Sequence, residues 1–133
     1  MRATLLCCAW RGHRDAKARS GDEAFERIDT DPRELLAVAE IDTAVVGTFQ
    51  ISFIPYLVWG GGSVAQIEFV RVSSALRGRR IGEHMMRWAI TQACSRGCLR
   101  VQLDTKNLRT DAHRFYERLG FRPTHTGMKL FLD

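Results

Sequence analysis

A basic, glycine-containing turn near the middle of the chain carries the residues best suited to bind a phosphorylated ligand. The turn is Arg77-Gly78-Arg79-Arg80-Ile81-Gly82, and it follows a β-like run that ends in Val70-Arg71-Val72. An amphipathic helix is predicted to begin directly after it. Backbone N–H groups at such a junction point outward at the positive end of the helix dipole, where they can bind a pyrophosphate. The alternative is a tight strand-to-helix turn whose arginines are only solvated.

Glu68 is the candidate general base. It interrupts the apolar run Ile67-Glu68-Phe69-Val70 within a predicted strand. Desolvation at such a position would raise the pKa of the carboxyl group towards neutrality, which suits a group that accepts a proton from an ammonium, directly or through water. The alternative is a carboxylate paired with Arg71, Arg100 or another surface arginine.

The histidines and cysteines show no pattern typical of a metal site. Cysteines stand at positions 7, 8, 94 and 98, and no two of them form a C-x-x-C pair, so we expect free, mostly buried thiols and no metal. His84 and His113 could serve as a base instead of Glu68. Both are predicted on polar helix faces, which favours simple surface exposure.

Length and composition indicate one domain with a single hydrophobic core. The chain has 133 residues, of which 45% are hydrophobic and 26% charged, as is ordinary for globular proteins. No apolar run approaches the roughly 20 residues that span a bilayer, and the apolar N-terminal stretch is too short for a signal peptide. A cytoplasmic protein with no membrane partner is therefore expected. The net charge of +5 suits phosphorylated ligands or nucleic acid, or else reflects a solvated, arginine-rich surface.

Hydrophobic periodicity predicts an antiparallel hairpin whose strands cover residues 34–41 and 44–54, with Asp42-Thr43 as the turn. A third strand covers about residues 64–72. Ahead of the hairpin, the pattern is weak. The sequence leaves two interpretations open, a strand over Thr4–Trp10 and a helix over Asp22–Ile28. The polar stretch of residues 11–21 between them is expected to be poorly ordered. The chain is accordingly divided into a weakly patterned segment, 1–33, and a core, 34–133.

The second half of the chain predicts a βαβ crossover. The helix after Gly82 has apolar residues at 3.6-residue spacing and stops at Gly97, and a fourth strand follows over residues 99–104. Such a connection makes the third and fourth strands parallel neighbours. A second helix, N-capped by Thr110 and ended by Gly120, precedes a short closing strand over Met128–Leu132.

The basic turn resembles the acetyl-CoA-binding signature of the GNAT superfamily of N-acetyltransferases, Arg/Gln-x-x-Gly-x-Gly/Ala. Arg77, Ile81 and Gly82 match the signature, and Arg80 stands where the first glycine is usual. An arginine keeps its backbone N–H, so binding is expected to survive this departure if the φ angle of Arg80 is ordinary.

A second motif of the same family follows in the expected order. The family pattern of Asn, then Ala, then Phe/Leu-Tyr-Glu-x-x-Gly-Phe resembles the stretch from Asn107 through Ala112 to Phe121. The resemblance covers residues 34–121. It implies a single-domain, GNAT-like α/β fold, in which helices flank a mixed central sheet and the antiparallel hairpin is followed by a βαβ cofactor-binding core.

The resemblance also implies an acetyl-CoA site along the third strand and the basic turn. Backbone groups of Val70 and Val72 would pair with the pantetheine arm, as an extended ligand can where a neighbouring strand has splayed away. N–H groups of the basic turn would hold the pyrophosphate, and its glycines would allow close approach. Asn107 resembles the family asparagine near the cofactor arm, or else stabilises its own loop. The implied cofactor-binding residues are Val70, Arg71, Val72, Arg77, Gly78, Arg79, Arg80, Ile81, Gly82 and Asn107.

Tyr116 resembles the family tyrosine that protonates the departing CoA thiolate. A phenol with a pKa of about 10 keeps its proton at neutral pH, so it can supply the proton that a leaving thiolate needs. The alternative is a core tyrosine, because position 116 shares an apolar stripe with Ala112 and Leu119. The catalytic residues are thus predicted to be Glu68, on the strand where several family members carry a glutamate base, and Tyr116 as the acid.

Together these residues predict an acyltransferase, an acetyl-CoA-dependent N-acetyltransferase that acetylates a primary amine by direct attack in a ternary complex. A non-catalytic module that binds CoA, or RNA through its arginines, is the alternative; nucleic acid is not expected as a partner of the enzyme. The acceptor is a small-molecule amine or a protein amino group, which we expect to meet the loop Tyr56–Ser63 and the N-terminal segment. Because that segment is weakly patterned, either the acceptor pocket is incomplete or a homodimer partner supplies part of it.

Overall fold

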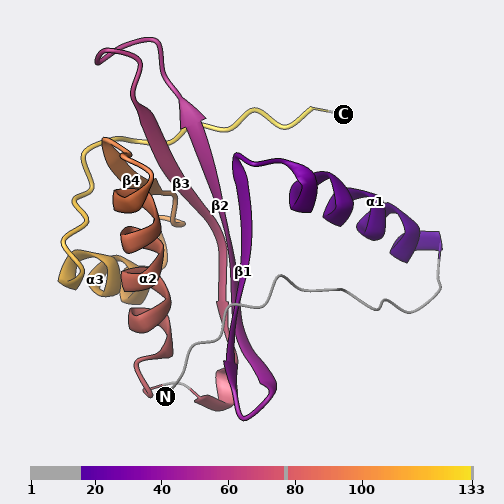
Figure 1. Cartoon of the computed structure of the whole chain (residues 1–133). Helices are drawn as coiled ribbons and strands as arrows, with labels where there is room; N and C mark the ends of the chain where they lie inside the picture. Colours follow the sequence, from indigo (N-terminus) through magenta and orange to yellow (C-terminus); the bar gives the residue numbers. More distant parts are fainter. Residues whose placement is uncertain (1–15, 77, 133) are drawn as a thin grey trace.

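The computed structural model describes residues 16–76 and 78–132, which form an α/β fold built on one sheet (Figure 1). The elements follow in the order α1 (Ala16–Thr30), β1 (Glu34–Ile41), β2 (Ala44–Pro55), β3 (Ser63–Val72), the 3-10 turn η1 (Ser74–Leu76), α2 (Ile81–Ser95), β4 (Arg100–Leu103) and α3 (Thr110–Arg118). The predicted hairpin, third strand, helix, fourth strand and second helix are confirmed in this order.

The strands lie side by side in the order β1-β2-β3-β4. β1 pairs with β2 and β2 with β3 in antiparallel fashion, whereas β3 and β4 are parallel, so the sheet is mixed as predicted. The parallel pair is joined through α2, because parallel strands need a crossover connection. Asp42 and Thr43 both have positive φ, 50° and 67°, which is the backbone of a tight two-residue hairpin turn.

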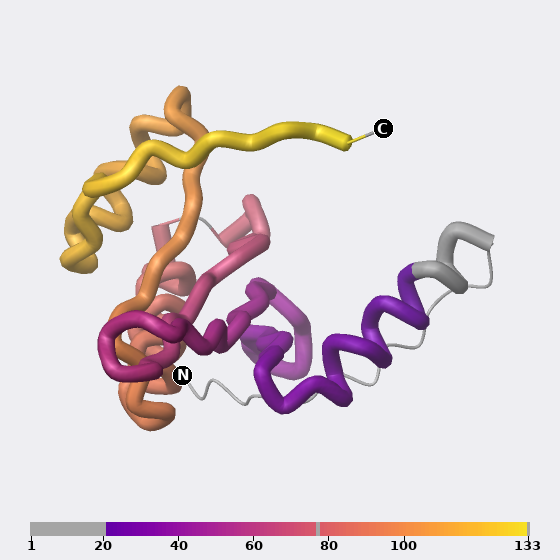
Figure 2. The backbone as a smooth tube through the Cα atoms, turned by 90° about the horizontal axis from the view of Figure 1, so that it is seen from above, coloured from indigo at the N-terminus to yellow at the C-terminus, as the bar shows by residue number. Residues whose placement is uncertain are grey.

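The helices lie on both sides of the sheet. α2 and α3 lie on one side, and α1 lies on the other, beside β1 (Figures 1 and 2). The core fills the space between α2 and the sheet, and Ile51, Ile67 and Met86 are at most 2% exposed. Successive strand residues point to opposite faces. The residues on either side of Ile67, which are Gln66 and Glu68, therefore belong to the face away from α2.

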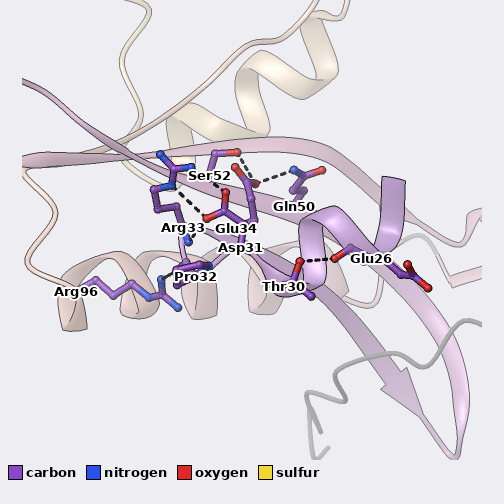
Figure 3. A network of polar contacts seen from close by, with 9 residues as sticks. All are labelled: Glu26, Thr30, Asp31, Pro32, Arg33, Glu34, Gln50, Ser52 and Arg96. Carbon is purple, nitrogen blue, oxygen red and sulfur yellow. Dashed lines mark hydrogen bonds and ion pairs between the residues drawn. The ribbon is translucent and has the colours of Figure 1, made fainter. Parts of the chain in front are cut away.

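Polar contacts fix the segment between α1 and β1 (Figure 3). The Arg33 guanidinium pairs with Asp31 at 2.9 Å. From beyond the end of α2, Arg96 Nη1 donates to the carbonyl oxygen of Pro32 at 3.0 Å, and its guanidinium carbon lies 4.0 Å from the ring centroid of Phe53. These contacts connect the end of α2 to the start of β1, and they set the position at which Glu34 enters the sheet.

The C-terminal tail is not the predicted closing strand. Residues 121–132 belong to no helix or strand and extend across to the side of the sheet on which α1 lies (Figures 1 and 2). Met128 and Leu132 are 94% and 87% exposed. The prediction over Met128–Leu132 is wrong because alternating apolar residues form a strand only beside a partner that bonds their backbone, and no strand of the described chain accompanies this tail.

The N-terminal helix is longer than its sequence pattern indicates. The sequence predicts a helix only over Asp22–Ile28, whereas α1 extends from Ala16 to Thr30. α1 thus begins within residues 11–21, where the sequence shows no helical pattern. The strand considered over Thr4–Trp10 lies outside the described residues.

Two local predictions on the α2 and α3 helices are also wrong. Thr110 is the first residue of α3 and not its N-cap, because Arg109 occupies the N-cap position with φ −89° and ψ 70° and its side chain makes no capping hydrogen bond. The expectation of mostly buried thiols is wrong for Cys94, which is exposed on α2, whereas Cys98 is half-buried. Both are free thiols, and burial raises the pKa of Cys98.

Candidate active site

Strand β3 loses its neighbour on one side halfway along its length. β4 pairs with β3 only from Val64, opposite Arg100, to Ile67, opposite Leu103. Among the described residues, no strand pairs with residues 68–72 on that side. Their backbone N–H and C=O groups can therefore bind an extended ligand.

A β-bulge interrupts the other side of β3 at the same level. The register with β2 shifts between Glu68, opposite Gln50, and Arg71, opposite Thr48. Phe69 adopts a left-handed φ of 55° and is 69% exposed. A bulge re-aims the strand beyond it. The bulge and the end of β4 pairing therefore both fall beside Glu68.

The strand then leads into the basic turn and an uncapped helix. The first helical hydrogen bond of α2 is donated by His84 N–H to the carbonyl oxygen of Arg80, at 3.0 Å, and no side chain caps the helix at Arg80. The N–H groups of Ile81, Gly82 and Glu83 precede this bond, so they face outward at the positive end of the helix. This arrangement is suited to an anion. Arg77 lies outside the described residues.

The φ angle of Arg80 is not ordinary. It is 58°, in the left-handed region, and Gly78 two residues earlier has φ 86°. Glycine adopts this conformation without a steric penalty, whereas other residues are strained in it. The turn therefore keeps a glycine-compatible backbone at the position where the family signature has its first glycine, and the Arg80 N–H is retained within it.

Replacing Arg80 with glycine is expected to stabilise the fold by about 1 kcal/mol, because the relief of left-handed strain exceeds the added entropy of the unfolded chain. Chemical denaturation measures this difference. Arg79→Gly is the matched control, since Arg79 is equally basic and exposed but has no positive φ. A stability gain in the control variant, or a loss in Arg80→Gly, would contradict the strain.

Gly82 brings the start of α2 close to α3 and β3. A Cβ atom at this position would lie 3.4 Å from Phe115 Cζ and 3.7 Å from Val72 Cγ2. The next residue, Glu83, pairs with Arg87 at 2.9 Å, as the i,i+4 spacing predicts. Hydrogen bonds from Arg87 hold the pKa of Glu83 below its ordinary value, so this acid is ionised and its charge is offset by a cation.

Tyr116 lies on α3 within a group of aromatic rings. Its ring makes edge contacts with Phe115 and Phe121, at centroid distances of 5.1 and 5.9 Å. It packs against the hydrophobic core. Burial raises the pKa of the Tyr116 phenol, against an opposing effect of Arg109. A phenol in this setting keeps its proton at neutral pH, as a general acid must.

Glu68 belongs to a polar face of the sheet, on the side away from α2. Its Oε1 accepts a hydrogen bond from Gln66 Nε2 at 2.9 Å. Two strands away, Glu34 Oε2 accepts hydrogen bonds from Gln50 Nε2 and Ser52 Oγ, both at 2.8 Å (Figure 3). The alternative of an ion pair between Glu68 and Arg71, Arg100 or another arginine is not seen among the described residues, and an amide bonds the carboxylate instead.

The two candidate catalytic residues approach β3 from opposite sides. α3, which carries Tyr116, lies with α2 on one side of the sheet, whereas Glu68 belongs to the other face. The sheet therefore lies between the two side chains.

The remaining candidates lie in simpler surroundings. Asn107 is exposed in the turn after β4. His84 is exposed on α2, and the His113 ring nitrogen Nε2 lies 3.1 Å from the carbonyl oxygen of Lys106. Sequence reasoning missed Gln66 and Gln102. The alternation of polar and apolar residues in β3 could have indicated Gln66, but the position of Gln102 depends on the register of β4.

The described residues form neither a membrane-spanning helix nor a metal-binding cluster. No helix among residues 16–76 and 78–132 has the length and apolar character needed to cross a membrane. No group of three or more His, Cys, Asp or Glu side chains in these ranges has the geometry of a metal site.

Comparison with known proteins identifies the family. Residues 3–121 match the model of the acetyltransferase (GNAT) family. The aminoalkylphosphonate N-acetyltransferase of Salmonella typhimurium is 36% identical over 122 residues, which are 91% of this chain and 77% of that protein. The glucosamine 6-phosphate N-acetyltransferase of Trypanosoma brucei brucei is 33% identical over 88 residues, 66% of this chain and 58% of that protein. The chain therefore belongs to the GNAT family of acetyltransferases.

A solved structure shares the fold of this chain. A Bacillus halodurans C-125 protein described as a transcriptional regulator superposes with a TM-score of 0.83 at 44% identity, covering 86% of this chain and 76% of that one. The resemblance to GNAT N-acetyltransferases, and the mixed sheet flanked by helices that it implies, are confirmed.

Proposed function

We propose that the protein transfers the acetyl group of acetyl-CoA to the primary amine of a small molecule by direct attack in a ternary complex. The observation that carries the proposal is the unpaired edge of β3 over residues 68–72, which leads directly into the uncapped start of α2. An extended pantetheine arm and a diphosphate require such a strand edge and such a helix start, in this order. Membership of the GNAT family supports the same donor.

The proposed cofactor contacts follow β3 and the basic turn. Backbone groups of Val70 and Val72 bond the pantetheine arm, while their half-buried side chains pack against the core. The N–H groups of Gly78 and of Arg80 to Gly82 hold the diphosphate, whereas the Arg79 N–H donates to the carbonyl oxygen of Leu76 at 3.4 Å. The exposed Arg79 and Arg80 side chains add positive charge. Asn107 lies in the turn after β4, beyond the level at which β4 stops pairing with β3.

Glu68 and Tyr116 each carry out one proton transfer of the reaction. Glu68, directly or through a bound water, takes one proton from the ammonium, and the freed amine nitrogen attacks the thioester carbonyl carbon. An N–C bond forms as the C–S bond breaks, and the nitrogen loses its second proton to water. A strand N–H near Val70 donates a hydrogen bond to the carbonyl oxygen as charge develops there. Tyr116 protonates the leaving thiolate and regains its proton from solvent.

The acceptor class is a small amine that also carries a phosphonate or phosphate group. The two relatives named above share this chemistry, an amino group and a phosphorus oxyanion in one small molecule. Arg71 stands on the polar face with Glu68, beyond the bulge, and is exposed. Glu68 would receive the ammonium of such a substrate and Arg71 its anionic end.

A thiol-release assay tests the proposal. The full chain is incubated with acetyl-CoA and a panel of amines, in which each aminoalkylphosphonate or amino-sugar phosphate is paired with its dephosphorylated analogue, and a peptide amine is included. We expect free CoA thiol with the phosphorus-containing amines at a rate about tenfold or more above their analogues, because the charged pair with an arginine is lost in the analogues. Equal rates within each pair would overturn the acceptor class. Acetyl-CoA binding without thiol release from any amine, or salt-sensitive RNA binding alone, would overturn the enzyme in favour of a binding module.

A further inference from the structure

Three hydrogen bonds connect Glu68 to a cation at the far end of the polar face. Arg100 Nε donates to Gln102 Oε1 at 3.0 Å, Gln102 Nε2 donates to Gln66 Oε1 at 2.7 Å, and Gln66 Nε2 donates to Glu68 Oε1 at 2.9 Å. We call these four side chains the amide relay.

The chemistry of its two ends fixes the direction of every bond in the amide relay. A guanidinium can only donate hydrogen bonds, and an ionised carboxylate can only accept them. Gln102 must therefore present its oxygen to Arg100 and its NH₂ group to Gln66, and Gln66 must present its NH₂ group to Glu68. Each amide has one satisfactory orientation, so the relay delivers an N–H donor to the carboxylate.

Strand register places the relay one residue before the gap. Gln66 and Gln102 are direct partners across β3 and β4, and Gln66 and Glu68 are two residues apart on the same face of β3. Pairing ends one residue later, between Ile67 and Leu103. The relay thus crosses from β4 to β3 immediately before the edge at which we place the thioester.

Aromatic contacts hold the outer end of the relay. The guanidinium carbon of Arg100 lies 4.6 Å from the ring centroid of Trp59 and 5.9 Å from that of Tyr56. The two rings are themselves 5.8 Å apart. Cation–π contacts at these distances restrict the guanidinium. The amide relay therefore connects the loop between β2 and β3 to Glu68.

We propose that Gln66 and Gln102 are positioning residues for Glu68. They hold its carboxylate by Oε1, which leaves Oε2 to receive the substrate ammonium. This inference rests on the proposed function, because it assigns Glu68 as the base of that reaction. The relay acts on the orientation of Glu68, without contact between the glutamines and the reacting atoms.

Gln50 provides a matched control. It is the direct partner of Glu68 on β2 and lies on the same face. Its Nε2 donates to Glu34 instead, at 2.8 Å (Figure 3). Gln50 therefore shares residue type, face and neighbourhood with the relay glutamines but has no part in the relay.

The other charged groups around Glu68 are unchanged in the proposed variants. Arg71 lies on the same face of β3, Asp104 follows the end of β4, and Glu34 lies on β1 beyond Gln50. Arg100 is the charged member of the relay itself. A difference between a relay variant and the Gln50 control thus reports on the relay and not on this shared background.

The test compares Gln66→Met, Gln102→Met and Gln50→Met, each of which keeps the side-chain length and removes the amide. Steady-state kcat and KM with the best amine of the panel, and the melting temperature, are measured in the full chain. For Gln66→Met we expect kcat to fall about tenfold while KM for acetyl-CoA changes by no more than about twofold, because the carboxylate loses the hydrogen bond that orients it. Gln102→Met should lower kcat by less, and Gln50→Met should leave both constants unchanged.

The variants test the relay and the base role of Glu68 separately. Equal losses of kcat in Gln66→Met and Gln50→Met, or an unchanged kcat in Gln66→Met, would overturn the relay. Where the melting temperature shows that Gln66→Met folds poorly, Gln102→Met is compared with the control instead. Full activity in Glu68→Gln would instead remove the base role from the proposed function, which is a separate outcome.

Discussion

Tyr116→Phe is expected to lower kcat for acetyl transfer by about 100-fold and to change KM for acetyl-CoA by no more than about twofold, because the variant loses a general acid but keeps its ring. The ring supplies the edge contacts with Phe115 and Phe121, so the packing of α3 is retained. Steady-state kinetics with the best amine of the panel measure both constants. Equal kcat in the variant would identify Tyr116 as a core residue only.

The pH profile gives an independent check on the same residue. Burial raises the pKa of the Tyr116 phenol above its ordinary value, which is about 10. The active, protonated form is therefore retained as the pH rises through the ordinary value and is lost only above it. An alkaline limb of kcat caused by Tyr116 must lie on that side and must disappear in Tyr116→Phe. An alkaline limb that persists unchanged in the variant belongs to another group.

Gly82→Asp is expected to weaken CoA binding about 100-fold relative to Gly82→Asn, because a carboxylate within about 5 Å of a diphosphate repels it across a partly screened site. Asn and Asp have nearly the same shape, so the comparison removes the effect of filling the space beside Phe115 and Val72. Isothermal titration calorimetry with CoA measures the affinity of both variants.

The same pair of variants should differ in stability in the opposite sense. An acidic side chain in the first turn of a helix interacts favourably with the dipole, by about 0.3–1 kcal/mol. We therefore expect Gly82→Asp to melt at or above the temperature of Gly82→Asn while it binds CoA far more weakly. A loss of affinity accompanied by an equal loss of stability would indicate damage to the helix. Equal affinity in the two variants would place the diphosphate elsewhere.

Much of the fold was readable from local patterns. The bounds of β1, Glu34–Ile41, agree with the sequence prediction at both ends, because a mostly apolar run that stops at a two-residue turn defines one strand of a hairpin without reference to the rest of the chain. α2 stops before Gly97, whose φ is 68°, as the glycine predicts. The C-terminal tail is also rich in apolar residues but has no partner strand, so the same local rule fails there.

The family and its two motifs could also be recognised from residue types and spacing, because a phosphate-binding turn and a tyrosine that donates a proton depend on few residues close together in sequence. The hydrogen-bond partner of Glu68 could not be predicted in this way. Gln102 reaches Gln66 only because β4 pairs with β3 in one register after a crossover through α2, and a shift by one residue would turn Gln102 to the other face. The left-handed φ of Arg80 is likewise imposed by the path from β3 into α2. The sequence by itself therefore determined the elements and the chemical groups, whereas the tertiary structure decided which groups meet, because contacts between distant segments depend on register and packing that no local pattern encodes.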